Sequence, residues 1–190
     1  IDDQEHSLFR RFPAIMNLSP RIYLDHHATT PVDPRVVEAM APLWENTYGN
    51  AASWHAFGQE ASKAVEHARE CIAEAIGAEA KAMVFTSGAT ESVNLALQGV
   101  CEFYENKGNH IVTTRTEHPA VYDCCQALEK KGCDLTVLSV DEFGRVDPEA
   151  VQEAITEKTI LLSVIHANNE IGTLNDVAAI GRIAKERGVL

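Results

Sequence analysis

Val84-Phe85-Thr86-Ser87-Gly88-Ala89-Thr90-Glu91-Ser92 is the stretch from which the fold can be predicted. Its first three residues are β-branched or aromatic and end a short apolar run, which is typical of a buried strand. The small residues Ser87–Thr90 predict a turn, and apolar residues at helical spacing up to Tyr104 predict an amphipathic helix. Free backbone N–H groups and a positive dipole end at the start of such a helix suit an anion. An ordinary connection with Thr90 as N-cap is the alternative.

The rest of the chain alternates between strand-like and helix-like patterns. Strands are predicted at Ile22–Leu24, Met83–Thr86, His110–Thr113, Leu135–Leu138 and Ile160–His166. Helices are predicted from Pro34 with Asp33 as N-cap, from Gln59 to Gly77, from Glu91, from Pro119, from Pro148 with Asp147 as N-cap, and from Asp176 to Gly188. The strands are continuous apolar runs, as in parallel sheets whose two faces are covered. We therefore predict an α/β fold with three α-β-α layers and a mostly parallel sheet.

Ligands of open parallel sheets bind where the carboxyl ends of the strands meet. This rule selects the turns Ser87–Thr90, Arg115–Pro119 and His166–Gly172, which contain His118 and the pair Asn168-Asn169. The residues alone thus predict a site for an anionic cofactor with one imidazole and one carboxamide. A surface or capping role for the histidine and a plain turn for the asparagines are the alternatives.

The charge and composition of the chain argue against several classes of partner and ligand. A net charge of −12 with 16 basic residues argues against nucleic acid and anionic membranes, and no apolar run is long enough to span a bilayer. The five cysteines form no C-x-x-C pair, which favours a reducing compartment, and we expect a cytoplasmic protein. The eight histidines lack ligand spacing, so no metal site is expected. Residues 1–15 have no signal-peptide pattern and are expected to be an extension outside the fold, either native or added.

Several segments together resemble the cysteine desulfurases, over roughly Ile22 to Leu190. They are Tyr23–Asp33, Gly49–Ser53, Thr86–Asn94, Glu117–Ala120 and His166–Gly172. Enzymes of this family use pyridoxal 5′-phosphate to move sulfur from L-cysteine to an enzyme cysteine as a persulfide, releasing L-alanine, for iron–sulfur clusters and other thio-cofactors. The resemblance implies an N-terminal arm at 16–32 and the first part of a pyridoxal-phosphate-dependent transferase-like large domain at 33–190. It also implies a homodimer and an iron–sulfur scaffold or another sulfur-acceptor protein as partner.

The resemblance also assigns roles to single residues. Ala89 and Thr90 match the family's phosphate-binding helix start. His118 matches the catalytic histidine that stacks on the cofactor ring and moves protons, and Asn169 matches the asparagine that binds the ring oxygen and the substrate carboxylate. Asn50 matches a segment that lines the substrate entrance.

Several family features have no match in this sequence, including the aspartate that pairs with the pyridine nitrogen, the glutamine beside it and the arginine that binds the substrate carboxylate. The Schiff-base lysine, in a Ser-Gly-His-Lys context, and the persulfide cysteine are both missing. The resemblance therefore implies the N-terminal portion of a desulfurase, which we expect to be inactive alone. A selenocysteine lyase or another class V aminotransferase-like enzyme is one alternative. A non-catalytic dimerisation or scaffold module is the other.

Overall fold

The computed structural model describes residues 22–190. The extension expected at 1–15 and the beginning of the expected arm, 16–21, lie outside the described residues. The chain divides into two units, Ile1–Val32 and Asp33–Leu190. The strand predicted at Ile22–Leu24 is wrong, because this stretch is irregular and Ile22 and Leu24 are exposed. A short apolar run forms a strand only where a neighbouring strand pairs with its backbone.

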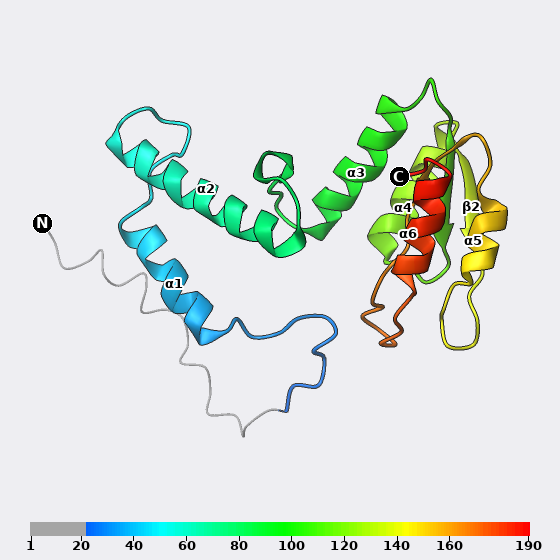
Figure 1. Ribbon diagram of the computed structural model, residues 1–190. Helices are drawn as coiled ribbons and strands as arrows, with labels where there is room; N and C mark the ends of the chain where they lie inside the picture. Colours follow the sequence, from blue (N-terminus) through cyan, green and yellow to red (C-terminus); the bar gives the residue numbers. More distant parts are fainter. Residues whose placement is uncertain (1–21) are drawn as a thin grey trace, which may run out of the picture. The chain divides into compact units, whose positions relative to one another are not determined.

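The second unit is built around a three-stranded parallel sheet in the order β2-β1-β3 (Figure 1). The strands are β1 (His110–Thr114), β2 (Asp134–Leu138) and β3 (Thr159–Leu162). Three of the predicted strands are therefore confirmed, although the third ends at Leu162 and not at His166 as predicted. The register places His110 of β1 opposite Asp134 of β2 and Thr159 of β3. Every residue of the central strand β1 is buried, as expected for a strand with neighbours on both sides and helices on both faces.

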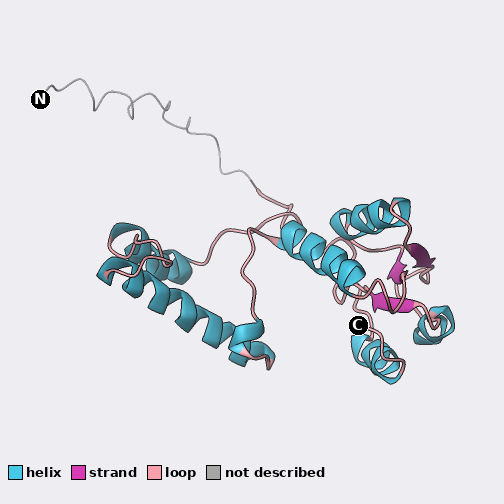
Figure 2. Ribbon diagram, turned by 90° about the horizontal axis from the view of Figure 1, so that it is seen from above, coloured by secondary structure: helices cyan, strands magenta, loops and turns pink. Residues whose placement is uncertain are grey.

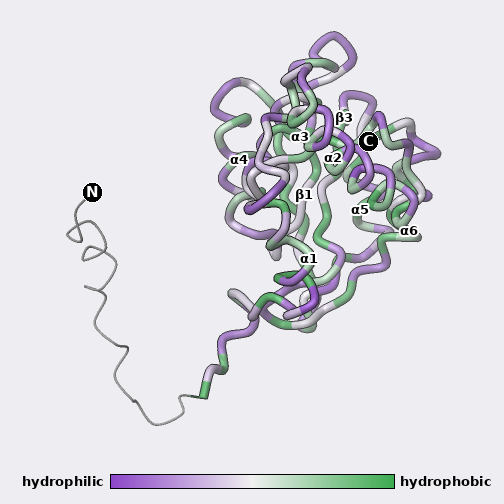
Figure 3. The backbone as a smooth tube through the Cα atoms, turned by 90° about the vertical axis from the view of Figure 1, so that its left-hand side faces the viewer, coloured by the Kyte–Doolittle hydropathy of each residue, from purple (hydrophilic) through white to green (hydrophobic). Residues whose placement is uncertain are grey.

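Two pairs of helices cover the two faces of the sheet, so the predicted three-layer architecture is confirmed (Figure 2). On one face, α3 (Ala89–Phe103) and α4 (Pro119–Lys130) pack on the sheet through a core of Leu97, Cys101, Ile111, Val121, Cys124, Cys125, Leu128 and Ile160. On the other, α5 (Pro148–Ala154) and α6 (Val177–Glu186) enclose a core of Val146, Val151, Ile155, Ile180, Ala184 and Val189. Figure 3 shows β1 between α4 and the pair α5 and α6.

The helix ends follow the capping residues. Asp33, Asp147 and Asp176 each accept a hydrogen bond from a backbone N–H in the first turn of α1 (Pro34–Glu45), α5 and α6. Gly77 closes α2 (Ala56–Ile76) in the left-handed conformation, at φ 67°. These boundaries were predicted. None of the helices between residues 22 and 190 is both long and apolar enough to cross a lipid bilayer.

The structure differs from the prediction for α2 in two respects, the residue at which the helix begins and the burial of its apolar face. This helix begins at Ala56 rather than Gln59, because His55 acts as its N-cap and accepts from the Gly58 N–H at 3.4 Å. Its apolar face was expected to be buried, yet Val65, Ile72 and Ile76 are 38%, 41% and 64% exposed. The helix is amphipathic as predicted, but among the described residues little packs against its apolar face.

The strand predicted at Met83–Thr86 is also absent. The segment follows the short 3₁₀ helix η2 (Ala80–Ala82) and is not paired with any strand that the structure describes. Arg69 of α2 holds it instead, donating to the Met83 carbonyl and stacking over the Phe85 ring at 4.8 Å. The β-branched composition of this stretch predicted a strand wrongly, because a strand forms only where a neighbouring backbone pairs with it.

A buried histidine ties the three strands together where they begin. His110 is 6% exposed, and its ring nitrogens contact the hydroxyls of Thr159 on β3 at 2.7 Å and Thr136 on β2 at 2.8 Å. Burial lowers the pKa of His110 below its ordinary value, and the nearby Asp134 carboxylate opposes this only in part.

We predict that this histidine makes the protein less stable in mild acid. The unfolded imidazole takes up a proton near pH 6.5 and the folded one only at lower pH, so stability present above about pH 6.5 is lost as the pH falls. Urea midpoints measured at pH 7.5 and 5.5 should fall further for the wild type than for His110→Gln. His67→Gln, on the exposed surface of α2, should behave like the wild type. Equal pH sensitivity of His110→Gln and wild type would contradict this assignment.

Candidate functional site

The topology brings two of the three predicted ligand turns, Arg115–Pro119 and His166–Gly172, to the same edge of the sheet. All strands are parallel, so the loops after β1 and β3 both leave from the edge where the strands' carboxyl ends lie, here called the carboxyl edge. Helix α3 packs on the sheet and ends at Phe103, shortly before β1 begins at the opposite, amino edge. Its first turn is exposed, and among the described residues no hydrogen bond joins it to the loops after β1 and β3.

The start of α3 is an ordered turn with unused donors. Ser87 donates its N–H and its hydroxyl to the Glu91 carboxylate, both at 2.6 Å, and these hydrogen bonds lower the pKa of Glu91. The N-cap Gly88 offers no side chain to the helix. No described residue accepts a hydrogen bond from the backbone N–H of Ala89 or Thr90, or from the Thr90 hydroxyl. These exposed groups can therefore be satisfied by water or by an anion.

His118 is exposed and is the N-cap of α4. Its Nδ1 accepts a hydrogen bond from the Ala120 N–H at 3.1 Å. An imidazole nitrogen that accepts carries no proton, so the neutral ring has its proton on Nε2. The sequence alternatives of a cap and of a functional histidine are thus compatible, because the cap uses one nitrogen and leaves the other free.

The adjacent residues Asn168 and Asn169 have different hydrogen-bond partners and therefore different roles. Both ends of the Asn168 carboxamide are engaged: its nitrogen donates to the Thr116 carbonyl at 3.0 Å, and its oxygen accepts from the N–H groups of Glu170 and Ile171 at 2.9 and 3.1 Å. Asn169 is exposed, and its nitrogen makes one contact of 3.3 Å with Glu170. Asn168 therefore builds the loop, whereas Asn169 keeps its carboxamide available to a ligand.

A carboxylate that the sequence analysis did not select joins the same two loops. Glu117 accepts from the Thr114 hydroxyl at 3.1 Å and from the backbone N–H of Ile165, which follows β3. Its half-buried position raises the pKa of Glu117, and the two hydrogen bonds partly oppose that rise. Together with the Asn168–Thr116 hydrogen bond, this contact holds the loop of His118 against the loop of Asn169.

Two more buried hydroxyls lie near the carboxyl end of β1. Thr113 is completely buried and Thr116 half-buried, and neither hydroxyl has a hydrogen-bond partner among the described residues. An unpaired buried hydroxyl is costly, so this end of the strand has unused capacity for a polar ligand or water.

Asn50 is not brought to this edge by any observed contact. Its side-chain oxygen accepts from the Ala52 N–H at 2.9 Å and forms a local turn between α1 and α2. Within residues 22–190, no hydrogen bond connects Asn50 to the loops of His118 and Asn169. In the same described range, no group of three or more His, Cys, Asp or Glu side chains is arranged to hold a metal ion.

Comparison with known proteins identifies relatives along nearly the whole described chain. The sequence model of the aminotransferase class-V family matches residues 22–190. The chain is 57% identical over 170 residues to the cysteine desulfurase IscS of Anaeromyxobacter sp. strain K, covering 89% of this chain and 42% of that protein. The chain thus spans less than half the length of this curated relative.

Solved structures show the same fold. A NifS-like protein superposes with a TM-score of 0.85 at 40% identity, over 88% of this chain and 46% of that one. SspA in complex with cysteine gives a TM-score of 0.84 at 36% identity, over 88% of this chain and 48% of that one. The partial α/β domain predicted from the sequence is therefore confirmed as one that NifS-like proteins share.

We predict that Glu117 stabilises the carboxyl edge as a hydrogen-bond acceptor and not through its charge. Glu117→Ala leaves the Ile165 N–H and the Thr114 hydroxyl without their partner and should cost about 1–3 kcal/mol of unfolding free energy. Glu117→Gln keeps an acceptor oxygen and should cost clearly less. Urea denaturation measures both variants, with Glu129→Ala on the exposed surface of α4 as control. If Glu117→Ala is no more harmful than Glu129→Ala, the carboxylate does not hold the loops.

Proposed function

The chain belongs to the aminotransferase class-V family, and from this we propose that the protein containing it is a cysteine desulfurase dependent on pyridoxal 5′-phosphate. One observation carries the proposal. In a chain 57% identical to a cysteine desulfurase, the 3.0 Å hydrogen bond from Asn168 to Thr116 holds the loops of His118 and Asn169 together. Those loops leave the same edge of the sheet, after β1 and β3.

The residues at this edge and at the start of α3 suit the cofactor. Pyridoxal phosphate joins a dianion to a flat ring that bears a hydroxyl. The unpaired N–H groups of Ala89 and Thr90 and the Thr90 hydroxyl suit the phosphate, which the positive end of the α3 dipole also favours. The His118 ring is exposed and able to cover one face of the pyridine, and the free carboxamide of Asn169 is able to bind the ring oxygen. When bound, the cofactor supplies a ring that withdraws electrons from the substrate.

The chain's own residues would then orient the substrate and move protons. We assign the movement of protons to the His118 imidazole: in the capped ring Nε2–H is a hydrogen-bond donor, and to take up a proton Nδ1 would have to release the Ala120 N–H. Asn169 would bind the carboxylate of L-cysteine, and Asn50 would line the substrate entrance. The relatives named for cysteine desulfurase activity, and the similar structure that holds cysteine, support this choice of substrate.

The proposal covers the whole protein and not this piece alone. Sulfur would pass to an enzyme cysteine as a persulfide and L-alanine would be released. Because this sequence contains neither the Schiff-base lysine segment nor a match to the persulfide cysteine, we propose that the 190-residue piece is not active by itself. We further propose a cytoplasmic homodimer that delivers sulfur to an iron–sulfur scaffold or another acceptor. Its arm would comprise residues 16–32 and its cofactor domain would begin at 33, behind the extension at 1–15.

The test is the product balance of the complete protein. With L-cysteine, pyridoxal phosphate and a thiol reductant, sulfide and alanine should appear in a 1:1 ratio. Alanine without sulfide would refute the desulfurase. Turnover of L-selenocysteine but not L-cysteine would point to a selenocysteine lyase, and a protein that shows no cofactor absorbance would be a non-catalytic module.

We predict that Thr90→Val weakens cofactor binding. The substitution keeps the shape of the side chain and removes the one hydroxyl assigned to the phosphate. Losing a hydrogen bond to a charged group costs about 1.5–3 kcal/mol, so Kd should rise by about 10- to 100-fold in an absorbance titration of the complete protein with pyridoxal phosphate. Thr156→Val, in the loop before β3 at the amino edge, is the matched control and should leave Kd unchanged. Unchanged affinity of Thr90→Val would remove Thr90 from the phosphate site.

A further inference from the structure

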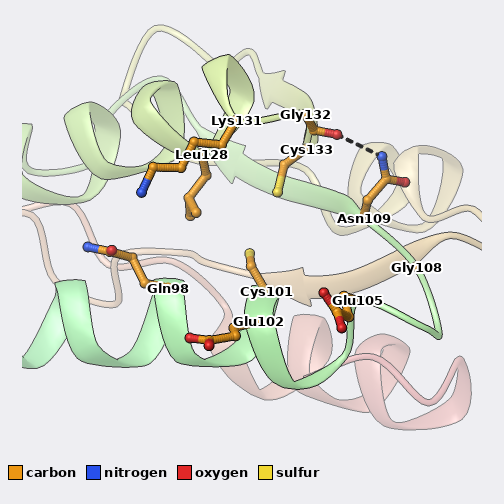
Figure 4. Close-up of a pocket in the computed structure, with 10 residues that line it drawn as sticks. All are labelled: Gln98, Cys101, Glu102, Glu105, Gly108, Asn109, Leu128, Lys131, Gly132 and Cys133. Carbon is orange, nitrogen blue, oxygen red and sulfur yellow. Dashed lines mark hydrogen bonds between the residues drawn. The ribbon is translucent and has the colours of Figure 1, made fainter.

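A second feature lies between α3 and α4, near the amino edge of the sheet, away from the turns described above. It is a hollow of about 390 Å³ whose walls include Cys101, Glu102 and Glu105 on one side and Leu128, Lys131 and Cys133 on the other. Figure 4 shows the sulfur atoms of Cys101 and Cys133 pointing into this hollow toward each other. Cys101 belongs to α3, whereas Cys133 directly precedes β2. The hollow therefore brings together two thiols from different elements.

The two thiols have different access to solvent. Cys101 is 9% exposed, and Cys133 is half-buried. Burial, together with contact with the Cys133 thiol, raises the pKa of Cys101 to about 12. The backbone beside Cys133 is held in place, because Asn109 donates to the Gly132 carbonyl at 3.0 Å (Figure 4).

We propose that Cys101 and Cys133 are an oxidative modification site and form an intramolecular disulfide when the protein meets a peroxide. Cys133, the more accessible thiol, attacks the peroxide as its thiolate, breaks the O–O bond and becomes a sulfenic acid, while water leaves. Cys101 then attacks the Cys133 sulfur and loses its proton, and the sulfenic hydroxyl leaves as a second water. Two thiols are oxidised by two electrons in total, and one hydrogen peroxide is reduced to two water molecules.

The other cysteines are poorer candidates for this reaction. Cys124 and Cys125 are 6% and 0% exposed within the core between α4 and the sheet, where an oxidant has little access. Cys71 is exposed on α2, where its sulfur lies 3.7 Å from a ring nitrogen of His67, and it does not line the hollow. Cys71 is therefore the natural control.

The experiment maps disulfides in the complete protein after treatment with hydrogen peroxide. Free thiols are alkylated under denaturing conditions, the protein is digested without reductant, and cross-linked peptides are identified by mass spectrometry. We expect one peptide pair joining Cys101 to Cys133, which separates on reduction, and the loss of two alkylatable thiols. The pair should persist in Cys71→Ser and vanish in Cys133→Ser. Because the bond limits the unfolded chain, the oxidised protein should also melt about 5–10 °C higher than the reduced one.

Three results would overturn the proposal. They are a Cys133 oxidised to sulfinic acid beside an alkylatable Cys101, a cross-link that uses another cysteine, and a Cys101 cross-link that survives in Cys133→Ser. Mapping of the wild type gives the first two answers even if a variant folds poorly. No step requires turnover of L-cysteine, so the result is independent of whether the proposed desulfurase activity is found.

Discussion

The parallel pairing of β1 with a strand on each side is the constraint on which the rest of this structure depends. Parallel neighbours cannot be joined by a tight hairpin, so the chain must cross over the sheet between strands, and helices do this here. The crossover helices α4 and α5 lie on opposite faces, where α3, before β1, and α6, after β3, pack beside them, and this removes all five residues of β1 from water. They also return every strand in the same direction, so polar loops collect at one edge while both faces stay apolar.

At that edge the loops are held by side chains more than by regular structure. Glu117 and Asn168 each bond the backbone of the opposite loop, and each is next in sequence to a residue that we assign to the cofactor, His118 and Asn169. The arrangement satisfies backbone groups that the strands leave unpaired where they end. Because Glu117 and Asn168 hold the loops together, Nε2 of His118 and the carboxamide oxygen of Asn169 are not needed for that purpose. The half-buried position of the Glu117 carboxylate disfavours its charged form, and its two hydrogen bonds offset part of this penalty.

Local signals predicted the elements well, and contacts between distant residues set the limit of prediction. Asp33, Asp147, Asp176 and Gly77 mark helix ends in the sequence because capping depends on residues a few positions away. The stretch Met83–Thr86 was misjudged because a strand needs a partner, and the sequence does not show which backbone will be adjacent. Glu117 was missed for a related reason: a carboxylate after a strand looks solvent-exposed until Ile165 is seen to donate to it. Asn168 and Asn169 are identical in type, and only their contacts distinguish the structural residue from the free one.

The cap at the start of α4 has a consequence for any acid–base role of His118. Protonation of Nδ1 would replace the acceptor of the Ala120 N–H with a second donor and break the hydrogen bond that begins the helix. Loss of the Nε2 proton with that bond intact would leave an imidazolate, so the ring cannot complete a proton-transfer cycle through Nε2 alone. Any step in which the ring takes up a proton therefore opens the first turn of α4, which couples the chemistry of His118 to the end of a helix.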